Sequence, residues 1–306
     1  MLKFILLIIV GFLWGSQYIF VKVALQENLD PTALTLFRIG IGTIFLVIVC
    51  LFMPRGSHDQ STTDRSPWWM FLIIGILEAA LPALLIAWGE LELDSSLAAI
   101  LLGTTPLFTI ILSCFILRAE RSSPGLILAI LVGFAGLLVL FGFRMQFDQK
   151  IHWISSIAVL LAAASFAASL VLLAKVKGHP PQHVARNLMF WGTIALLPVW
   201  LIFGNPSDVT ITWISAGSVI YLGILGSSVV FLIYVQLIRI AGATFASLSN
   251  YLVPVVGVAL GISLGQEHIL VTDMIALAII MGALFAANPE CIQRLCKRQG
   301  TLKSKE

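Results

Sequence analysis

Apolar residues gather in long uninterrupted stretches along this chain, and short polar connectors separate them. Ten stretches are long enough to span a membrane as helices: roughly 4–24, 33–53, 68–88, 96–117, 124–143, 152–174, 184–203, 213–235, 244–264 and 270–287. A helix crosses the hydrocarbon core with about 20 mainly apolar residues, whereas a β-barrel strand is about 10 residues long with alternating polarity. The continuous pattern predicts an all-α membrane protein of ten transmembrane helices.

The composition supports this interpretation. Of the 306 residues, 59% are hydrophobic and only 11% are charged, whereas soluble domains are about 25% charged. A water-soluble fold of this length could not bury so much apolar surface, which argues against a soluble enzyme or a nucleic-acid-binding protein. Ten spans would take roughly 200 residues, so no room remains for a separate soluble domain.

The first apolar stretch could be mistaken for a signal peptide, because Lys3 precedes it. The stretch is about 20 residues long, however, and no A-x-A-like cleavage site follows it. Trp14, Gly15, Ser16 and Gln17 also interrupt it. We interpret it as a retained helix.

The positive charges are divided unequally between alternate connectors. One set holds 14 of the 18 Lys and Arg residues: Lys3, Arg55, Arg65, Arg118, Arg121, Lys175, Lys177, Arg186, Arg239, Arg294, Lys297, Arg298, Lys303 and Lys305. The opposite set holds only Arg144 and Lys150. Because cytoplasmic loops carry the excess of Lys and Arg, we expect a multi-pass protein of the plasma (inner) membrane with both termini cytoplasmic.

Two segments of the chain resemble each other. Residues 98–120 and 246–267 each lead from small residues into a mid-helix proline, Pro106 or Pro254, and each ends on a glutamate, Glu120 or Glu267. The repeat unit is then five spans. Because five is odd, the second copy enters the membrane from the opposite side, which is an inverted repeat common among secondary transporters. We expect repeats at 1–146 and 147–290, and a basic cytoplasmic tail at 291–306.

The chain as a whole resembles a known family. The stretches 12–25, 81–109 and 230–261, together with the doubled proline-to-glutamate segments, are similar to EamA-type transporters of the drug/metabolite transporter superfamily. The resemblance covers roughly 4–287. It implies two inverted five-helix repeats and the transport, mostly outward, of amino acids, nucleotide-related metabolites or drugs. One departure is that Trp191 stands about where the first half has Arg38, so the two halves are not chemically equivalent.

Glu78 is the strongest candidate for a functional residue, because an ionisable residue inside the bilayer is costly and points to function. It lies mid-span, in GILEAALPALLIAW. We expect it to bind a proton or a cationic substrate group. The alternative is a permanent structural pair with Lys22 or Arg38. Those two basic residues lie near the external ends of their spans, where they either snorkel to the interface or, for Arg38, bind a substrate carboxylate.

Two helix faces have the polarity of a cavity wall. Trp14, Gln17 and Tyr18 share one face by their i, i+3, i+4 spacing. Ser247, Asn250, Tyr251 and Pro254 form a second face, on which Pro254 leaves the carbonyl of Asn250 free. The alternative for both faces is interhelical hydrogen bonding.

Further candidates have simpler explanations that compete with a site. Trp191, Tyr234, Trp88 and Thr104 are weaker candidates, because aromatic residues near span ends often form interfacial belts. Ser165 and Ser169 stand among alanines, a pattern that favours close helix packing. Pro106 and Pro254 are expected to kink their helices and serve gating.

The predicted function is secondary transport, with export of small metabolites such as amino acids or related compounds by alternating access and with Glu78 coupling protons. A passive facilitator or channel stays open as an alternative. An intramembrane hydrolase is also conceivable from GISLG at 261–265, although this motif needs a strand–turn–helix context.

The expected partners are a small-molecule substrate, the lipid bilayer and protons. No nucleic acid, cofactor or metal is expected, and no nucleotide-binding motif points to ATP. A monomer suffices because one chain holds both halves, and a homodimer is compatible with the pattern.

Overall fold

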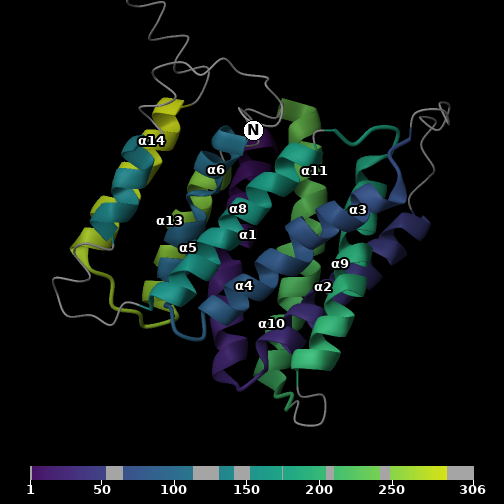
Figure 1. Ribbon diagram of the computed structural model, residues 1–306, viewed down its shortest axis with the longest axis horizontal. Coiled ribbons are helices and arrows are strands. Elements are labelled where there is room, and N and C mark those ends of the chain that lie inside the picture. Colours follow the sequence, from purple (N-terminus) through teal and green to yellow (C-terminus); the bar gives the residue numbers. More distant parts are fainter. Residues whose placement is uncertain are drawn as a thin grey trace, which may run out of the picture.

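The computed structural model describes residues 2–52, 65–112, 131–140, 152–173, 175–204, 210–241 and 249–287. Every regular element in these ranges is helical, which confirms the all-α prediction. The helices lie side by side in one bundle, with α14 (Val271–Ala287) at its edge (Figure 1). Most of these helices contribute residues to the cavity described below.

Among the described residues, six helices are long and apolar enough to cross a membrane: Leu2–Gln26, Pro31–Phe52, Trp68–Gly89, Trp153–Leu173, Gln182–Phe203 and Trp213–Tyr234. Shorter apolar helices cover Ser95–Thr109, Leu131–Leu140, Leu252–Ser263 and Val271–Ala283. Each of the ten predicted stretches overlaps one of these helices. The count of ten spans stays a prediction, because these four helices are shorter than a span within the described residues.

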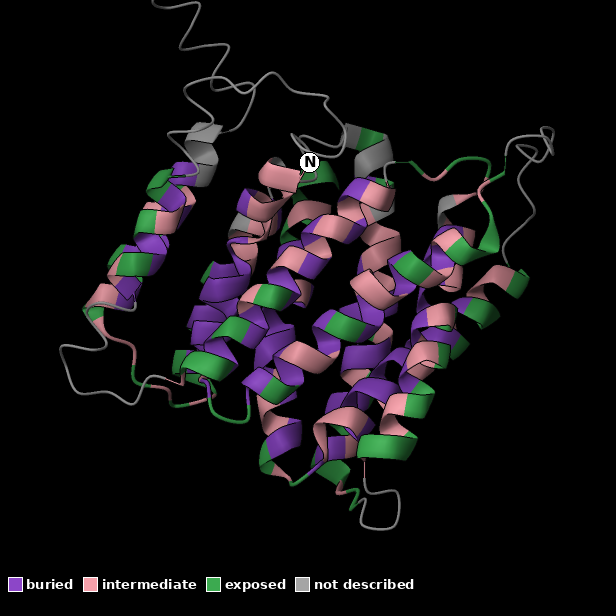
Figure 2. Cartoon of the chain, in the orientation of Figure 1, coloured by how far each residue is buried: buried purple, intermediate pink, exposed green. Residues whose placement is uncertain are grey.

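The outer surface of the bundle is apolar. Trp213 is 95% exposed, Leu51 77% and Phe203 76%, and Figure 2 shows exposed residues on the outward faces of the helices while buried residues line their contacts. Such large apolar side chains are stable on the outside only where lipid, and not water, surrounds them.

The third apolar stretch is a helix with a π-helical segment in its middle. It runs through α3 (Trp68–Gly75), the π-helix η2 (Ile76–Ala80) and α4 (Leu81–Gly89). Pro82 has no N–H to donate to the carbonyl of Glu78, four residues earlier, and the N–H of Leu81 donates to Ile76 five residues back. A π-turn holds an extra residue, so it changes which side chains face the bundle interior.

The eighth stretch has the same construction. It consists of α10 (Trp213–Gly223), the π-helix η4 (Ile224–Val229) and α11 (Val230–Ala241). No proline stands here; instead the Ser228 hydroxyl donates to the carbonyl of Gly223 at 3.1 Å and to that of Gly42 at 2.9 Å. Both π-segments begin at the isoleucine of a Gly-Ile-Leu sequence, after Gly75 and after Gly223.

The fourth stretch, expected as one helix over 96–117, is broken in two. It forms α5 (Ser95–Leu102) and α6 (Thr105–Leu112), with a turn at Gly103 and Thr104 between them. Pro106 is the cause, because its ring would clash with the carbonyl of Leu102 in a continuous helix. The hydroxyl of Thr104 donates to the carbonyl of Leu101 at 2.6 Å, and that of Thr105 donates to the carbonyl of Leu102 at 2.7 Å. The break is therefore satisfied internally.

α2 (Pro31–Phe52) and α9 (Pro181–Phe203) are packed against each other in opposite directions. The Cys50 thiol near the end of α2 donates to the carbonyl of Gln182 near the start of α9 at 3.7 Å. At the centre of the pair, the hydroxyls of Thr43 and Thr193 lie 2.9 Å apart. Each hydroxyl also lies within hydrogen-bond distance of the carbonyl four residues earlier in its own helix, so one hydroxyl can donate to its carbonyl while the other donates across the pair. The same contacts therefore appear from either helix.

Other extensive contacts are matched in the same manner. α1 (Leu2–Gln26) packs on α13 (Ser249–Ser263), and α8 (Trp153–Leu173) packs on α5 and α6. The third stretch contacts α8 and α9, and the eighth contacts α1 and α2. Each of these contacts thus has a counterpart in which a helix before residue 142 and one after it exchange roles.

Candidate functional site

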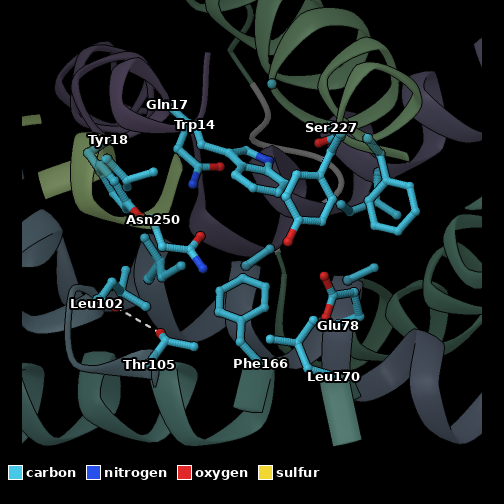
Figure 3. Close-up of a pocket in the computed structure, with 18 of the residues that line it drawn as sticks. Trp14, Gln17, Tyr18, Glu78, Leu102, Thr105, Phe166, Leu170, Ser227 and Asn250 are labelled. Carbon is cyan, nitrogen blue, oxygen red and sulfur yellow. Dashed lines mark hydrogen bonds between the residues drawn. The ribbon is translucent and has the colours of Figure 1, made fainter. Parts of the chain in front are cut away.

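A cavity of about 170 Å³ lies between helices of the two halves of the chain. Eight of the predicted residues line it: Trp14, Gln17, Tyr18, Arg38, Glu78, Pro106, Tyr234 and Asn250. In Figure 3 the labelled side chains of Trp14, Asn250, Phe166 and Glu78 surround one space. The predicted face of Trp14, Gln17 and Tyr18 therefore lines the cavity, and Asn250 of the second predicted face lines it as well.

Arg38 is a buried arginine that is held by neutral acceptors. Its side chain is 8% exposed. Nη2 donates to the Gln17 side-chain oxygen at 2.5 Å, and Nε donates to the Ser227 hydroxyl at 3.2 Å. In the described part of the chain no carboxylate lies within ion-pair distance of Arg38. A guanidinium with five donors thus borders the cavity without a protein counter-ion at contact.

Glu78 reaches the cavity from the π-helix η2. Its carboxylate accepts a hydrogen bond from the Ser169 hydroxyl of α8, while Ser165 of α8 donates to the neighbouring carbonyl of Leu77 at 2.7 Å. The predicted structural alternative, a pair of Glu78 with Lys22 or Arg38, is not formed. Small-residue packing also proved an incomplete account of Ser165 and Ser169, because both hydroxyls bond η2.

Aromatic rings form much of the remaining wall. The rings of Trp14 in α1 and Tyr234 in α11 lie 4.9 Å apart, centroid to centroid. Phe166 and Phe231 line the cavity as well. The contact between Trp14 and Tyr234 joins the first half of the chain to the second at the edge of the cavity.

The broken helix contributes backbone to the wall. Leu102, Gly103, Thr105 and Pro106 all line the cavity, and the bond from Thr105 to Leu102 is dashed in Figure 3. Pro254 does not line the cavity. Its ring packs so near Gly103 that a Cβ at Gly103 would lie 2.9 Å from it. Pro254 of α13 therefore contacts the turn that separates α5 from α6.

Five other candidates lie elsewhere or are not described. Trp191 packs on Trp68, with ring centroids 5.3 Å apart, outside the cavity. Trp88 is 43% exposed, and the Thr104 hydroxyl is bonded within its own turn. Ser247 and the side chain of Tyr251 lie outside the described residues.

The packing of the π-segments corrects the correspondence between Arg38 and Trp191. A Cβ at Gly223 would meet the carbonyl oxygen of Arg38 at 2.8 Å, and a Cβ at Gly75 would meet that of Leu188 at 2.6 Å. The same comparison pairs Trp191 with Ile41. Leu188, and not Trp191, is therefore the counterpart of Arg38, and the second half has no cation there.

Sequence reasoning missed Ser227 and Phe166 at the cavity, and Ser169 as the hydrogen-bond partner of Glu78. The repeated Gly-Ile-Leu sequence at the start of the two π-segments was a usable signal for Ser227. Aligning the two copies places Glu78 opposite Gly226, and Ser227 is the next residue. The spacing of Ser165 and Ser169 by four residues was a second signal, since it puts two hydroxyls on one helix face.

Hydrogen bonds also join the two halves where α4, α5 and α8 end or begin. The Glu267 carboxylate accepts from the backbone N–H groups of Ser95 at 2.7 Å and Ser96 at 3.0 Å, and from both hydroxyls, so it caps the N-terminus of α5. Glu92 accepts from Ser155 at 2.6 Å and lies 2.9 Å from His152. Among the described residues no three His, Cys, Asp or Glu gather in a metal-binding group.

The EamA-like transporter family model matches residues 1–142 and 153–288, which is almost the whole chain. The chain belongs to this family. An EamA transporter is a multi-pass membrane transporter, and the six long apolar helices agree with that.

Relatives that match this EamA transporter over nearly their full length are named as transporters or exporters. The uncharacterized transporter YoaV of Bacillus subtilis is 24% identical over 91% of both chains. A probable terminal-alkyne amino-acid exporter of Streptantibioticus cattleyicolor is 24% identical over 92% of this chain and 90% of its own. The uncharacterized inner membrane transporter YedA of Escherichia coli is 25% identical over 89% and 86%.

A solved crystal structure is similar to the EamA transporter in fold. The TM-score is 0.61 at 20% identity, over 93% of this chain and 96% of the other. The similarity extends over the whole bundle and so supports the arrangement of helices described above.

Proposed function

We propose that this EamA transporter is a secondary transporter that exports small metabolites, such as amino acids or related compounds, by alternating access. The observation that carries the proposal is the cavity between the halves, which holds an arginine and a carboxylate that are not paired with each other. A volume of about 170 Å³ is close to that of the ~150 Å³ cavity that admits benzene. The site is thus scaled to one small molecule.

Alternating access requires two bodies that can rock about the cavity. The matched helix contacts and the antiparallel α2–α9 pair support two inverted repeats, because a two-fold axis through Thr43 and Thr193 would exchange them. The family match over 1–142 and 153–288 also supports halves near the predicted division. We propose ten spans in this arrangement.

The chemistry of the lining selects the class of substrate. Arg38 can bind a carboxylate with two parallel hydrogen bonds. Glu78 can accept a hydrogen bond from an ammonium group or bind a proton. The rings of Trp14 and Phe166 supply apolar contact for the rest of the molecule. A small zwitterion with an apolar part would use all three features.

Proton coupling separates this proposal from a passive facilitator. We propose that Glu78 binds a proton in one half of the cycle and releases it in the other. A facilitator needs no titrating carboxylate, and its flux would not respond to a proton gradient. Hydrolysis is less favoured, because the Ser263 hydroxyl of the G-x-S-x-G sequence donates to the carbonyl of Ala259 within its own helix at 2.7 Å.

The test is the set of metabolites that appear outside cells overproducing the protein. Arg38→Gln and Glu78→Gln remove the two charges of the cavity, and Arg186→Gln and Glu27→Gln remove the same charges outside it. We expect specific compounds to accumulate outside with the wild type and both control variants and not with the cavity variants. A protonophore should abolish the accumulation if transport is proton-coupled.

Three outcomes change the proposal. Accumulation with Glu78→Gln at the wild-type level would make Glu78 structural. Accumulation that persists with a protonophore would favour the facilitator. Accumulation with none of the proteins would remove the support for export, and uptake into proteoliposomes with and without a proton gradient would then decide.

We also propose that both termini are cytoplasmic and that a monomer in the lipid bilayer suffices. After replacement of the 4 native cysteines by serine, a cysteine at Gln26 should react with an impermeant thiol reagent on intact cells. A cysteine at Lys177 should react only after lysis. The reverse pattern would invert the orientation.

A further inference from the structure

Glu90 is a buried carboxylic acid that the transport scheme above does not use. It follows α4 directly, its side chain is 0% exposed, and it is not among the residues that line the cavity. Within the described part of the chain neither of its carboxylate oxygens has a hydrogen-bond partner. Buried carboxylates are otherwise paired or bonded, so this one requires an explanation.

Lys22 is the nearest obvious counter-ion, but it is committed elsewhere. Its ammonium donates to the backbone carbonyls of Glu90 and Leu93, each at 2.7 Å. These two bonds satisfy carbonyls at the C-terminal end of α4, as a C-terminal lysine can do. The ammonium thus binds the backbone of Glu90 and not its carboxylate.

The other charged groups around Glu90 are also occupied. Four titratable or charged side chains act on it electrostatically: Lys22 and Tyr18 from α1, Arg38 from α2 and Glu267 after α13. Glu267 bears the same charge and is saturated by the N-terminus of α5. Arg38 points its donors to Gln17 and Ser227 instead.

This geometry favours the neutral acid. Burial removes the water that would stabilise the anion, and no protein donor replaces it. Glu90 lies just beyond the span that ends at Gly89, and burial raises the pKa of its carboxyl well above the usual range, against the smaller opposing effects of Lys22 and Arg38. An ionised Glu90 would, in turn, attract the guanidinium of Arg38.

We propose that Glu90 is a proton-binding site, protonated in this conformation, that controls whether Arg38 faces the cavity. With the proton bound, Glu90 is neutral and Arg38 remains at Gln17 and Ser227, where it can bind an anionic group in the cavity. Without the proton, the anion at Glu90 competes for the same guanidinium. Proton and anionic substrate therefore bind cooperatively, and the coupling is reciprocal.

This site is separate from Glu78 in position and in partner. Glu78 lines the cavity and accepts from Ser169, whereas Glu90 does not line the cavity and its backbone carbonyl is bound by Lys22. The link to substrate rests on the proposed function. The protonation of Glu90 does not, and it can be measured without any substrate.

The first experiment is an infrared titration of the purified full-length protein, in which protonated carboxyl groups are followed by their C=O stretch and its shift in heavy water. We expect a protonated carboxyl near neutral pH that is present in the wild type and in Glu78→Gln and absent in Glu90→Gln. Glu27→Gln is the control for a carboxyl outside the site. Lys22→Met should move the loss of the Glu90 band to higher pH by roughly one unit, because an opposite charge has been removed.

In protein that already carries Glu78→Gln, a band that survives the further change Glu90→Gln, or no protonated carboxyl at all, would show an ionised Glu90 and overturn the inference. If Glu90→Gln does not yield a monodisperse protein, the shift in Lys22→Met decides, because only a carboxyl close to Lys22 responds to that change. An unmoved band in Lys22→Met overturns the assignment.

The second experiment tests the coupling to Arg38. Arg38→Gln should raise the pH at which the Glu90 band is lost, as Lys22→Met does, whereas the control Arg186→Gln should leave it unchanged. An Arg38→Gln titration identical to the wild type would refute the coupling. Absence of export together with the expected titrations would reject the proposed function and leave the proton site intact.

Discussion

Gly75 provides the sharpest test of the packing that positions Glu78. A Cβ at this residue would lie 2.6 Å from the carbonyl oxygen of Leu188 and 3.1 Å from the amide nitrogen of Gly192. Both are backbone atoms of α9, so neither can rotate away. The contact must lengthen to at least 3.0 Å, below which Cβ contacts essentially do not occur. Gly75→Ala therefore forces α3 and η2 away from α9.

Two opposing effects set the magnitude. Overpacking of a tight contact costs about 1–3 kcal/mol, while replacing glycine by alanine within a helix gains about 1 kcal/mol. Gly217 in α10 is the matched control, because a Cβ there meets nothing within 4 Å. The helix-propensity gain is common to both variants, so the difference in unfolding free energy between them should be about 1–3 kcal/mol.

The assay is thermal unfolding in detergent, followed by the fraction of protein that remains monodisperse. At roughly 2–4 °C per kcal/mol, Gly75→Ala should unfold several degrees below Gly217→Ala. Because η2 follows Gly75 directly, export should fall in Gly75→Ala and not in Gly217→Ala. Equal unfolding temperatures would refute the close contact between the third helix and α9.

Three further predictions concern contacts between the halves. Glu267→Gln should lower the Tm, by about 1 kcal/mol in stability, because it removes a negative charge from the N-terminus of α5; thermal unfolding checks this. The hydroxyl of Ser155, and then His152, hold the pKa of the Glu92 carboxyl below its usual range. A lowered pKa adds stability above the usual value and loses it as pH falls through the lowered one, so Ser155→Ala should lower the Tm at neutral pH and have less effect at acid pH, where the Glu92 carboxyl is protonated. Thr43→Val and Thr193→Val should have equal effects that are non-additive by about 0.6 kcal/mol in a double-mutant cycle.

Each of these predictions has a result that contradicts it. A Glu267→Gln protein as stable as the wild type would mean that the hydrogen bonds, and not the charge, account for the cap. If Ser155→Ala lowered the Tm equally at neutral and at acid pH, the ionisation of Glu92 would not be the cause of the loss. Strictly additive threonine variants would mean that the two hydroxyls act only within their own helices.

The periodic features of the site could be predicted from the sequence. Gln17 and Tyr18 lie at the cavity because a helix fixes which residues share a face, and the same is true of Asn250. Glu78 was identifiable because a carboxylate is rare in the middle of an apolar span. These inferences needed only the order of residues within one helix.

The features of the site that depend on contacts between helices could not be predicted from the sequence. The partner of Glu78 is Ser169, 91 residues away, and no spacing rule connects them. The π-segments add a residue to a turn, so they shift every later side chain away from the regular helical phase. Trp191 is a residue type that often lines binding sites, but in this helix its ring packs against Trp68. Only the packing at Gly75 and Gly223 reveals that Leu188 is the counterpart of Arg38.

The contact between Thr43 and Thr193 has a consequence for the balance of conformations. In the proposed arrangement of two halves related by a two-fold axis, exchanging the halves turns an inward-open shape into an outward-open one. Perfectly identical halves would therefore make the two shapes equal in free energy. Any preference must arise at positions where the halves differ, such as Arg38 against Leu188 and Glu78 against Gly226. Substitutions at those unequal positions should reset the resting ratio of the two shapes, whereas the same change made at both Thr43 and Thr193 should leave that ratio untouched and alter only the ease of passing between them.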